Sequence, residues 1–453
     1  MAILGGFAVP HPPLIIPQIG KGEEQQIKGT IDAYHQVARM IADLQPDTIV
    51  VISPHAPLYA DYLHISPGKV GYGNFRSFGC PDLEFTVKYD TQFIDALVRL
   101  CEDSNIPAGT LGERSSELDH GSMIPLYFIN QYYHNYSLVR ISISGLPFLT
   151  HFQLGTLITK TSERLDKRVV IVASGDLSHK LKASGPYGYA KEGPEFDQKV
   201  ISALKNGDLS QLLIIPEPLY EAAAECGLRS LIILAGALNQ KDFQAQLLSY
   251  EGTFGVGYAV ASFIVTGESN HNFAQILEHR VHTNEDEYVA LARKALEYYV
   301  QYDQILPRPA DLSAELLNQR AGVFVSLHIG DQLRGCIGTI KPTTKCIADE
   351  IIRNAVLAGC EDPRFYPVQP DELPYLIYSV DVLTKPEPVQ SLSELDPKRY
   401  GIIVSCGNRQ GLLLPDLPGI NDVSQQLEIA LRKAGIAAHE TYKIERFEVV
   451  RHT

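Results

Sequence analysis

Hydrophobic residues in the first half of the chain fall either in short apolar runs or in longer amphipathic stretches. Mainly apolar runs cover 2–9, 48–53, 138–144 and 168–174, and the run at 48–53 is continuous and rich in β-branched residues. A continuous run of this kind is typical of a strand that is buried on both faces. Between the first two runs, apolar residues of 23–44 recur at helical spacing. Strands that alternate with helices predict an α/β layer structure.

The same alternation continues to about residue 265. The pattern predicts a helix over 218–238 and two further strands over 245–250 and 257–265. The segment that follows is polar and rich in turn-forming residues, which is typical of a linker. We therefore expect a first domain over residues 1–266 and a linker over 267–283.

Residues 284–453 have a different pattern, in which helices mix with separate strand-like runs. An amphipathic helix is expected to begin near Asn284, because acidic residues there would lie in its first turn. Strand-like runs cover 322–327, 375–383 and 401–405. This part is expected to be a smaller α+β domain, and a length of 453 residues also favours two domains.

Composition limits the kinds of partner. A net charge of −14 argues against binding to nucleic acid or to anionic membranes, because both need a basic surface. No apolar run approaches the ~18 residues of a transmembrane helix. Seven cysteines without a C-x-x-C pair indicate reduced thiols in a cytoplasmic protein. The same spacing excludes zinc ribbons and cluster-bearing radical enzymes. The oligomeric state stays open, a homo-oligomer included.

Three histidines share one position relative to the predicted strands. His11, His55 and His179 each follow a buried strand, and His120 lies in a polar Asp-His-Gly loop. In open α/β sheets, sites form in the crevice at the carboxyl ends of the strands. Imidazole with carboxylate is a common ligand set for Fe(II), and Zn or Cu can also use it. The pattern favours a metal or acid/base site.

Four motifs occur in the order seen in a known family: Pro-His-Pro at 10–12, Ser-Pro-His-Ala at 53–56, Asp-His-Gly at 119–121 and Gly-Asp-Leu-Ser-His at 175–179. The first domain thus resembles LigB-like class III extradiol dioxygenases. The resemblance implies a central mixed sheet flanked by helices. It also implies Fe(II) held by His11 and His55, with His179 as acid/base and His120 beside the substrate. A small aromatic diol and O2 would be the substrates.

The third ligand has two candidates. The family carboxylate precedes a helix that resembles Leu231–Leu238 here, and counting back from it reaches Cys226, with Glu225 one residue earlier. The Memo branch, to which the chain is also similar, has a cysteine in this slot. Glu225 would complete a two-His, one-carboxylate set, whereas a Cys226 thiolate would favour softer metals such as Cu or Zn. Solvated Glu225 and a buried, inert Cys226 are the plain alternatives.

The second domain carries its own motif. Leu-Arg-Gly-Cys-Ile-Gly-Thr at 333–339, with the segments 361–366 and 411–415, resembles the AMMECR family. Arg334 and Arg364 could bind an anion and Cys336 could be a nucleophile, or the motif could be a packed turn. The two domains together resemble the AmmeMemoRadiSam system, which implies a radical-SAM partner protein.

Three functions follow from these resemblances. The first is a non-haem Fe(II) dioxygenase that cleaves a small aromatic diol. The second is a metal-binding component that works with the radical-SAM partner on another substrate. The third is a Memo-like scaffold without catalysis. Whether Glu225 or Cys226 faces the histidines distinguishes the first from the second.

The expected linker gives the first test. Limited proteolysis of the full chain should cut between Gly267 and Asn284, because few contacts would cross a polar, turn-rich segment. Mass spectrometry of the fragments locates the cuts. Early cleavage elsewhere, with this segment resistant, would contradict the boundary.

Overall fold

The computed structural model describes residues 2–113, 116–269, 273, 285–329, 332–370, 372–373, 376–417 and 419–453. Contacts divide the chain into two compact units, Met1–Leu277 and Glu278–Thr453. Most of the expected linker, 267–283, lies outside the described residues, so its boundaries stay a prediction. Each unit is described by itself.

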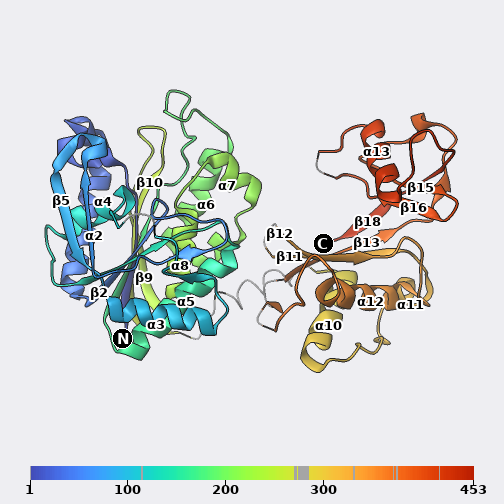
Figure 1. The fold of residues 1–453 in the computed structure, drawn as a ribbon, viewed down its shortest axis with the longest axis horizontal. Coiled ribbons are helices and arrows are strands. Elements are labelled where there is room, and N and C mark those ends of the chain that lie inside the picture. The colour runs from blue at the N-terminus through green and yellow to red at the C-terminus, as the bar shows by residue number, and fades with distance from the viewer. Residues whose placement is uncertain are drawn as a thin grey trace. The chain divides into compact units, whose positions relative to one another are not determined.

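The first unit is built on a sheet of six strands: β1 (Ile3–Val9), β2 (Thr48–Ser53), β7 (Ser137–Ser142), β8 (Val169–Ser174), β9 (Lys241–Glu251) and β10 (Tyr258–Glu268). Their order is β7-β2-β8-β1-β10-β9 (Figure 1). The strands from β7 to β1 are parallel, whereas β10 and β9 are antiparallel to their neighbours. The expected mixed sheet is therefore confirmed.

Helices cover both faces of this sheet, which explains why β2 and β8 are apolar and buried along their whole length. On one face lie α2 (Lys28–Leu44) and α4 (His120–Ile129). On the other, α8 (Leu228–Ala237) packs against the sheet and α5 (Phe148–Leu165) packs against α8 (Figure 1). The predicted layer structure is the one observed.

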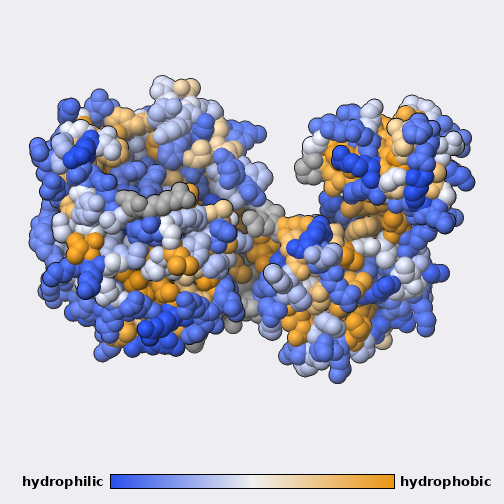
Figure 2. All heavy atoms as spheres, viewed as in Figure 1, coloured by the Kyte–Doolittle hydropathy of each residue, from blue (hydrophilic) through white to orange (hydrophobic). Residues whose placement is uncertain are grey.

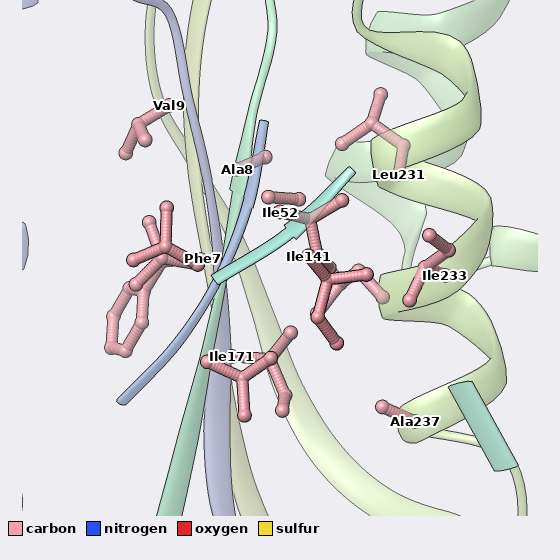
Figure 3. Packing of buried hydrophobic residues seen from close by; sticks show 14 of the residues in the cluster. Phe7, Ala8, Val9, Ile52, Ile141, Ile171, Leu231, Ile233 and Ala237 are labelled. Carbon is pink, nitrogen blue, oxygen red and sulfur yellow. The ribbon is translucent and has the colours of Figure 1, made fainter. Parts of the chain in front are cut away.

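Side chains from successive positions of a strand enter opposite layers. Ile52 and Ile141 lie on the side of Leu231 in α8, whereas Phe7 points to the other side of the sheet (Figure 3). All belong to one buried apolar cluster. The period of two along each strand is what lets a single sheet hold two helical layers.

The other described elements of the first unit are the 3-10 helices η1 (Pro13–Ile15), η2 (Glu23–Ile27), η3 (Arg76–Phe78) and η4 (Leu209–Ile214); the helices α1 (Pro17–Gly20), α3 (Thr91–Asp103), α6 (Glu192–Asn206) and α7 (Glu217–Ala223); and the strands β3 (Leu63–His64), β4 (Val70–Phe75), β5 (Cys80–Lys88) and β6 (Ala108–Gly109).

The helix predicted over 218–238 is wrong as a single element. The structure divides it into α7 and α8, separated by residues 224–227. Ala224 has a φ of 53°, a left-handed conformation that ends α7. The apolar spacing continues through the break, so it gave no sign of it. Cys226 lies inside the break, where its backbone is free of helical hydrogen bonds.

The second unit contains two antiparallel sheets. One has the order β12-β11-β13-β18 and the other β14-β17-β15-β16; the strands are β11 (Val323–Ile329), β12 (Gln332–Gly338), β13 (Leu376–Leu383), β14 (Glu387–Pro388), β15 (Gly401–Cys406), β16 (Arg409–Leu413), β17 (Lys443–Phe447) and β18 (Val449–His452).

Among the described residues of this unit, four helices and a short 3-10 helix accompany these sheets: α10 (Glu287–Tyr302), α11 (Ala314–Asn318), α12 (Ile347–Cys360), α13 (Val423–Ala434) and η6 (Leu392–Glu394). α10 and α12 pack on the first sheet, and α13 packs on the second. This confirms the smaller α+β fold.

The surface is mainly hydrophilic on the face shown in Figure 2, with apolar residues between the polar ones. Within the described ranges, no helix is long and apolar enough to cross a membrane.

The contact between α5 and α8 supplies a test of the packing. A Cβ atom on Gly155 would lie 2.1 Å from the carbonyl oxygen of Ile233. Gly155→Val should therefore push the helices apart and lower the free energy of unfolding by about 1–3 kcal/mol or more. Lys160→Val, at an exposed position of the same helix, should lower it by only about 0.5 kcal/mol. Urea unfolding measures both, and equal stabilities would contradict the close contact.

Candidate metal centre

The parallel strands end at the same edge of the sheet. Val9 pairs with Ser174, and Ile52 pairs with Ala173, so β1, β8 and β2 stop at one level. The loops that follow carry His11, His55 and the 175–179 motif. These residues are consequently delivered to one point from separate parts of the chain.

Three side chains converge closely enough to share a metal ion. Nε2 of His11 lies 3.0 Å from Nε2 of His55 and 3.6 Å from Sγ of Cys226. All three ligand atoms lie within 4.8 Å of one another. Tetrahedral zinc with ordinary bond lengths would separate two nitrogens by about 3.3 Å, and nitrogen from sulfur by about 3.6 Å. The spacing therefore fits a single ion.

The hydrogen bond at Nδ1 of His11 turns Nε2 of the ring toward His55. The Ser174 hydroxyl donates to the Gly121 carbonyl at 2.6 Å, so its oxygen accepts from Nδ1–H of His11 at 3.0 Å. Nε2 then carries the lone pair that faces His55. Burial, and after it the nearby histidines, lowers the pKa of His11 well below its usual range. A neutral imidazole oriented in this way is the form that binds metals.

His55 is held by its own strand end. Its backbone N–H donates to Oγ of Ser53 at 3.2 Å, and the Ser53 hydroxyl donates to Oδ1 of Asp119 at 2.5 Å. Asp119 is also the N-cap of α4, where it accepts from the backbone of Ser122. One carboxylate thus fixes both a candidate ligand loop and the helix that begins with His120.

Cys226 reaches the site because the helix is broken there. Its N–H donates to the carbonyl of Asp176, and the N–H of Asp176 donates to Sγ, both at 3.3 Å. A Cβ on Gly175 would lie 2.2 Å from Cα of Gly227, so this close approach needs glycine. Burial raises the pKa of the Cys226 thiol well above its usual range, and metal binding would displace its proton.

Glu225 has a different role. Its Oε2 accepts a hydrogen bond of 2.6 Å from the backbone N–H of Leu228, at the start of α8. Burial raises the pKa of Glu225 to about 7. Among the described residues, the group of potential ligands contains Cys226 and not Glu225. The geometry therefore favours the cysteine as third donor.

His120 and His179 border the same cleft, which has a volume of about 680 Å³. The ring of His120 lies 4.1 Å from that of His55, centroid to centroid. Burial, with His55 second, lowers the pKa of His120 to about 4. Nδ1–H of His179 donates to the Ala224 carbonyl, which leaves Nε2 as the free acceptor. Burial lowers the pKa of His179 as well.

The rest of the cleft is partly aromatic. Phe78, Tyr187, Phe254 and Tyr258 line it, together with Lys182. The Tyr187 ring lies 5.0 Å from that of His179, in an edge-on contact. The cleft thus offers flat apolar walls next to the imidazoles.

The sequence motifs gave no role to Asp176, although it belongs to the 175–179 motif and contacts His11 of the Pro-His-Pro motif. It is buried, lines the cleft, and accepts the N–H of His11 at 2.8 Å. Burial raises the pKa of Asp176 to about 7. Its place within the 175–179 motif was a signal, but only the histidine of that motif drew attention.

In the second unit, each of the two arginines singled out by the sequence is paired with a carboxylate. Arg334 donates two hydrogen bonds to Glu372, at 2.7 and 2.9 Å. Arg364 pairs with Asp362, which also accepts the N–H of Cys336. Carboxylates thus balance both guanidinium groups. Arg334 and Cys336 lie in strand β12, so the packed turn offered as an alternative is wrong, and the paired guanidinium groups do not form an open anion site.

Comparisons with known proteins cover both units. A family model described as the catalytic LigB subunit of aromatic ring-opening dioxygenase matches residues 5–261, and one described as AMMECR1 matches 289–452. The Clostridium acetobutylicum protein CA_C1420 is 41% identical over 466 residues, spanning 100% of this chain and 99% of its own. A Thermotoga maritima protein is 49% identical over 170 residues, 37% of this chain and 98% of its own.

Among solved structures, the uncharacterized protein PH0010 from Pyrococcus horikoshii has 32% identity and a TM-score of 0.34. That match covers 36% of this chain and 88% of the other.

The donor set gives a test of the centre. The double variant His11→Ala/His55→Ala should lose stoichiometric Fe(II) or Zn(II), because two of three donors are gone. Cys226→Ser should bind metal more weakly, whereas Glu225→Gln should keep it. Metal analysis after anaerobic purification measures content, and circular dichroism checks folding. Undiminished metal in the double variant would rule the site out.

Proposed function

Because the chain belongs to the LigB family of catalytic dioxygenase subunits, here fused to an AMMECR1 domain, we propose that its first unit is a metal-dependent oxidoreductase for a small substrate. The convergence of His11, His55 and Cys226 carries this proposal. One transition-metal ion, bound by these side chains, would supply Lewis-acid and redox chemistry. The cleft beside it would hold the substrate.

The thiol donor affects which ion fits. Two imidazoles and a thiolate suit copper and zinc, and iron also accepts them, whereas the two-His, one-carboxylate set is the one typical of Fe(II) oxygenases. Because Glu225 accepts a hydrogen bond from the start of α8, it does not complete the two-His, one-carboxylate set. The cleavage of a catechol therefore has less support than the resemblance alone gave it. Oxidative chemistry in a wider sense, on iron or copper, is the proposal.

His179 has the geometry of an acid/base. Its Nδ1–H is engaged by the Ala224 carbonyl, so the tautomer is fixed and Nε2 can take a proton from the substrate. Because burial lowers its pKa, the imidazole is neutral near pH 7, the form that can accept a proton. The backbone of Ser178 donates to buried Asp197 at 2.8 Å, which holds the loop in place.

His120 would contact the substrate as a neutral side chain, since burial lowers its pKa to about 4. The aromatic residues Phe78, Tyr187 and Phe254 favour a small planar substrate such as an aromatic diol. O2 would be the co-substrate.

The fusion to a second unit favours a role for this protein within a multiprotein system. The Clostridium acetobutylicum relative matches along both units, so the fusion is not peculiar to this chain. We include a radical-SAM partner protein in the proposal, as the combination of the two families implies. Co-purification of such a protein from the native host would support this part.

His179 gives the test of mechanism. His179→Ala should keep its metal, because the ring lies outside the donor group, yet lose about 10²–10⁴-fold in turnover. O2 consumption with a panel of aromatic diols, measured on iron- and copper-loaded protein, would follow the rate. His134→Ala, an exposed position, is the control. Metal loss as complete as in the His11→Ala/His55→Ala double variant would make His179 a ligand instead.

A further inference from the structure

Arg140 is an exception within its strand. β7 is otherwise apolar or small, and Arg140 is 1% exposed, the largest of the fully buried side chains described. Moving a guanidinium out of water costs several kcal/mol unless its partners compensate. The groups around the Arg140 guanidinium should therefore indicate its role.

The guanidinium holds the segment that precedes α4. Its Nη2 donates to Oε1 of Glu113 at 2.8 Å, and Nη1 donates to the Glu117 carbonyl at 2.7 Å. Nη1 also lies 3.6 Å from Oδ2 of Asp119. Nε donates to Ser66 at 2.6 Å. Three points of one loop are thus tied to a single buried cation.

Stability alone does not account for this cluster. His64, fully buried beside it, makes no hydrogen bond through either ring nitrogen within the part of the chain that the structure describes. Its Nε2 lies 3.9 Å from Oε2 of Glu113, which is too long for a hydrogen bond. Burial, followed by the nearby Arg140 charge, lowers the pKa of His64 to about 4. Well-packed apolar side chains are often as stable as such a buried ionic cluster, or more so.

The cluster connects to the metal centre through Asp119. That carboxylate accepts from the Ser53 hydroxyl, and Ser53 accepts the N–H of His55. Gly121 lets α4 approach closely, since a Cβ there would lie 2.4 Å from Oγ of Ser53. A continuous series of polar contacts therefore runs from Arg140 to a candidate ligand.

We propose that Arg140 is a positioning residue of the metal centre, which acts on His55 through Asp119 and Ser53. This inference rests on the proposed metal site. By fixing the carboxylate, Arg140 holds the His55 loop in the ligating geometry before the ion arrives. Loss of such outer contacts typically weakens metal binding roughly 10–100-fold.

The experiment uses Co²⁺ titration of the full-length protein, with the visible absorption of bound Co²⁺ as the signal. Arg140→Met and Ser53→Ala should each weaken Co²⁺ binding roughly 10–100-fold and shift the spectrum, because the ligand geometry changes. Since both act through His55, the double variant should lose little more than the weaker-binding single variant. Additive losses would overturn the proposal.

Lys241→Met is the matched control. Lys241 is also buried and paired with two carboxylates, Glu163 and Glu268. It lies opposite Glu268, at the end of the sheet away from the site. This variant should lose stability yet bind Co²⁺ as the wild type does. Equal weakening in Lys241→Met would assign the effect to general destabilisation and overturn the proposal.

Two further outcomes are decisive. Folded Arg140→Met with wild-type affinity and spectrum overturns the proposal while leaving the metal site intact. If Arg140→Met does not fold, Ser53→Ala and Asp119→Asn decide by the same affinities. A wild-type protein that binds no Co²⁺ would instead overturn the metal site, and this inference with it.

Discussion

The candidate site depends on the common level at which three parallel strands end. Val9, Ser174 and Ser53 close β1, β8 and β2 at one edge of the sheet. From there only short loops are needed to bring two imidazole nitrogens to 3.0 Å. A shift of one residue in either pairing would turn the strand's side chains to the opposite faces and separate the loops. The apolar core that fixes the register thereby fixes the site.

The site collects polar groups that are costly to bury. Burial raises the pKa of Asp176 to about 7 and that of Cys226 well above its usual range, and it lowers the pKa values of the four histidines. Shifts of this kind are typical of functional sites, where the surrounding fold offsets the cost. In the second unit, by contrast, the conspicuous arginines are balanced by carboxylates, as in a structural network.

Glycines and a helix break give the backbone the room that this arrangement needs. Gly175 and Gly227 let the end of β8 touch the start of α8, and the left-handed Ala224 ends α7. Together they present Cys226 to His11, at 3.6 Å. The Ala224 carbonyl then orients His179. A single irregular segment thus places one candidate ligand and the candidate acid/base.

The sequence by itself determined the α/β and α+β classes, because apolar periodicity reports which faces are buried. It also singled out His11, His55 and His179, since each stands in a motif just past a strand, and His120 through its Asp-His-Gly motif. It did not decide whether Glu225 or Cys226 is the third ligand, because adjacent side chains point in different directions. Which of them faces the histidines was set by a helix break that apolar spacing does not reveal. In the predicted strand 138–144, nothing in the sequence distinguished Arg140 from a solvent-exposed charge. Only the tertiary structure, by enclosing it and bringing Asp119 beside it, connected that charge to the metal centre.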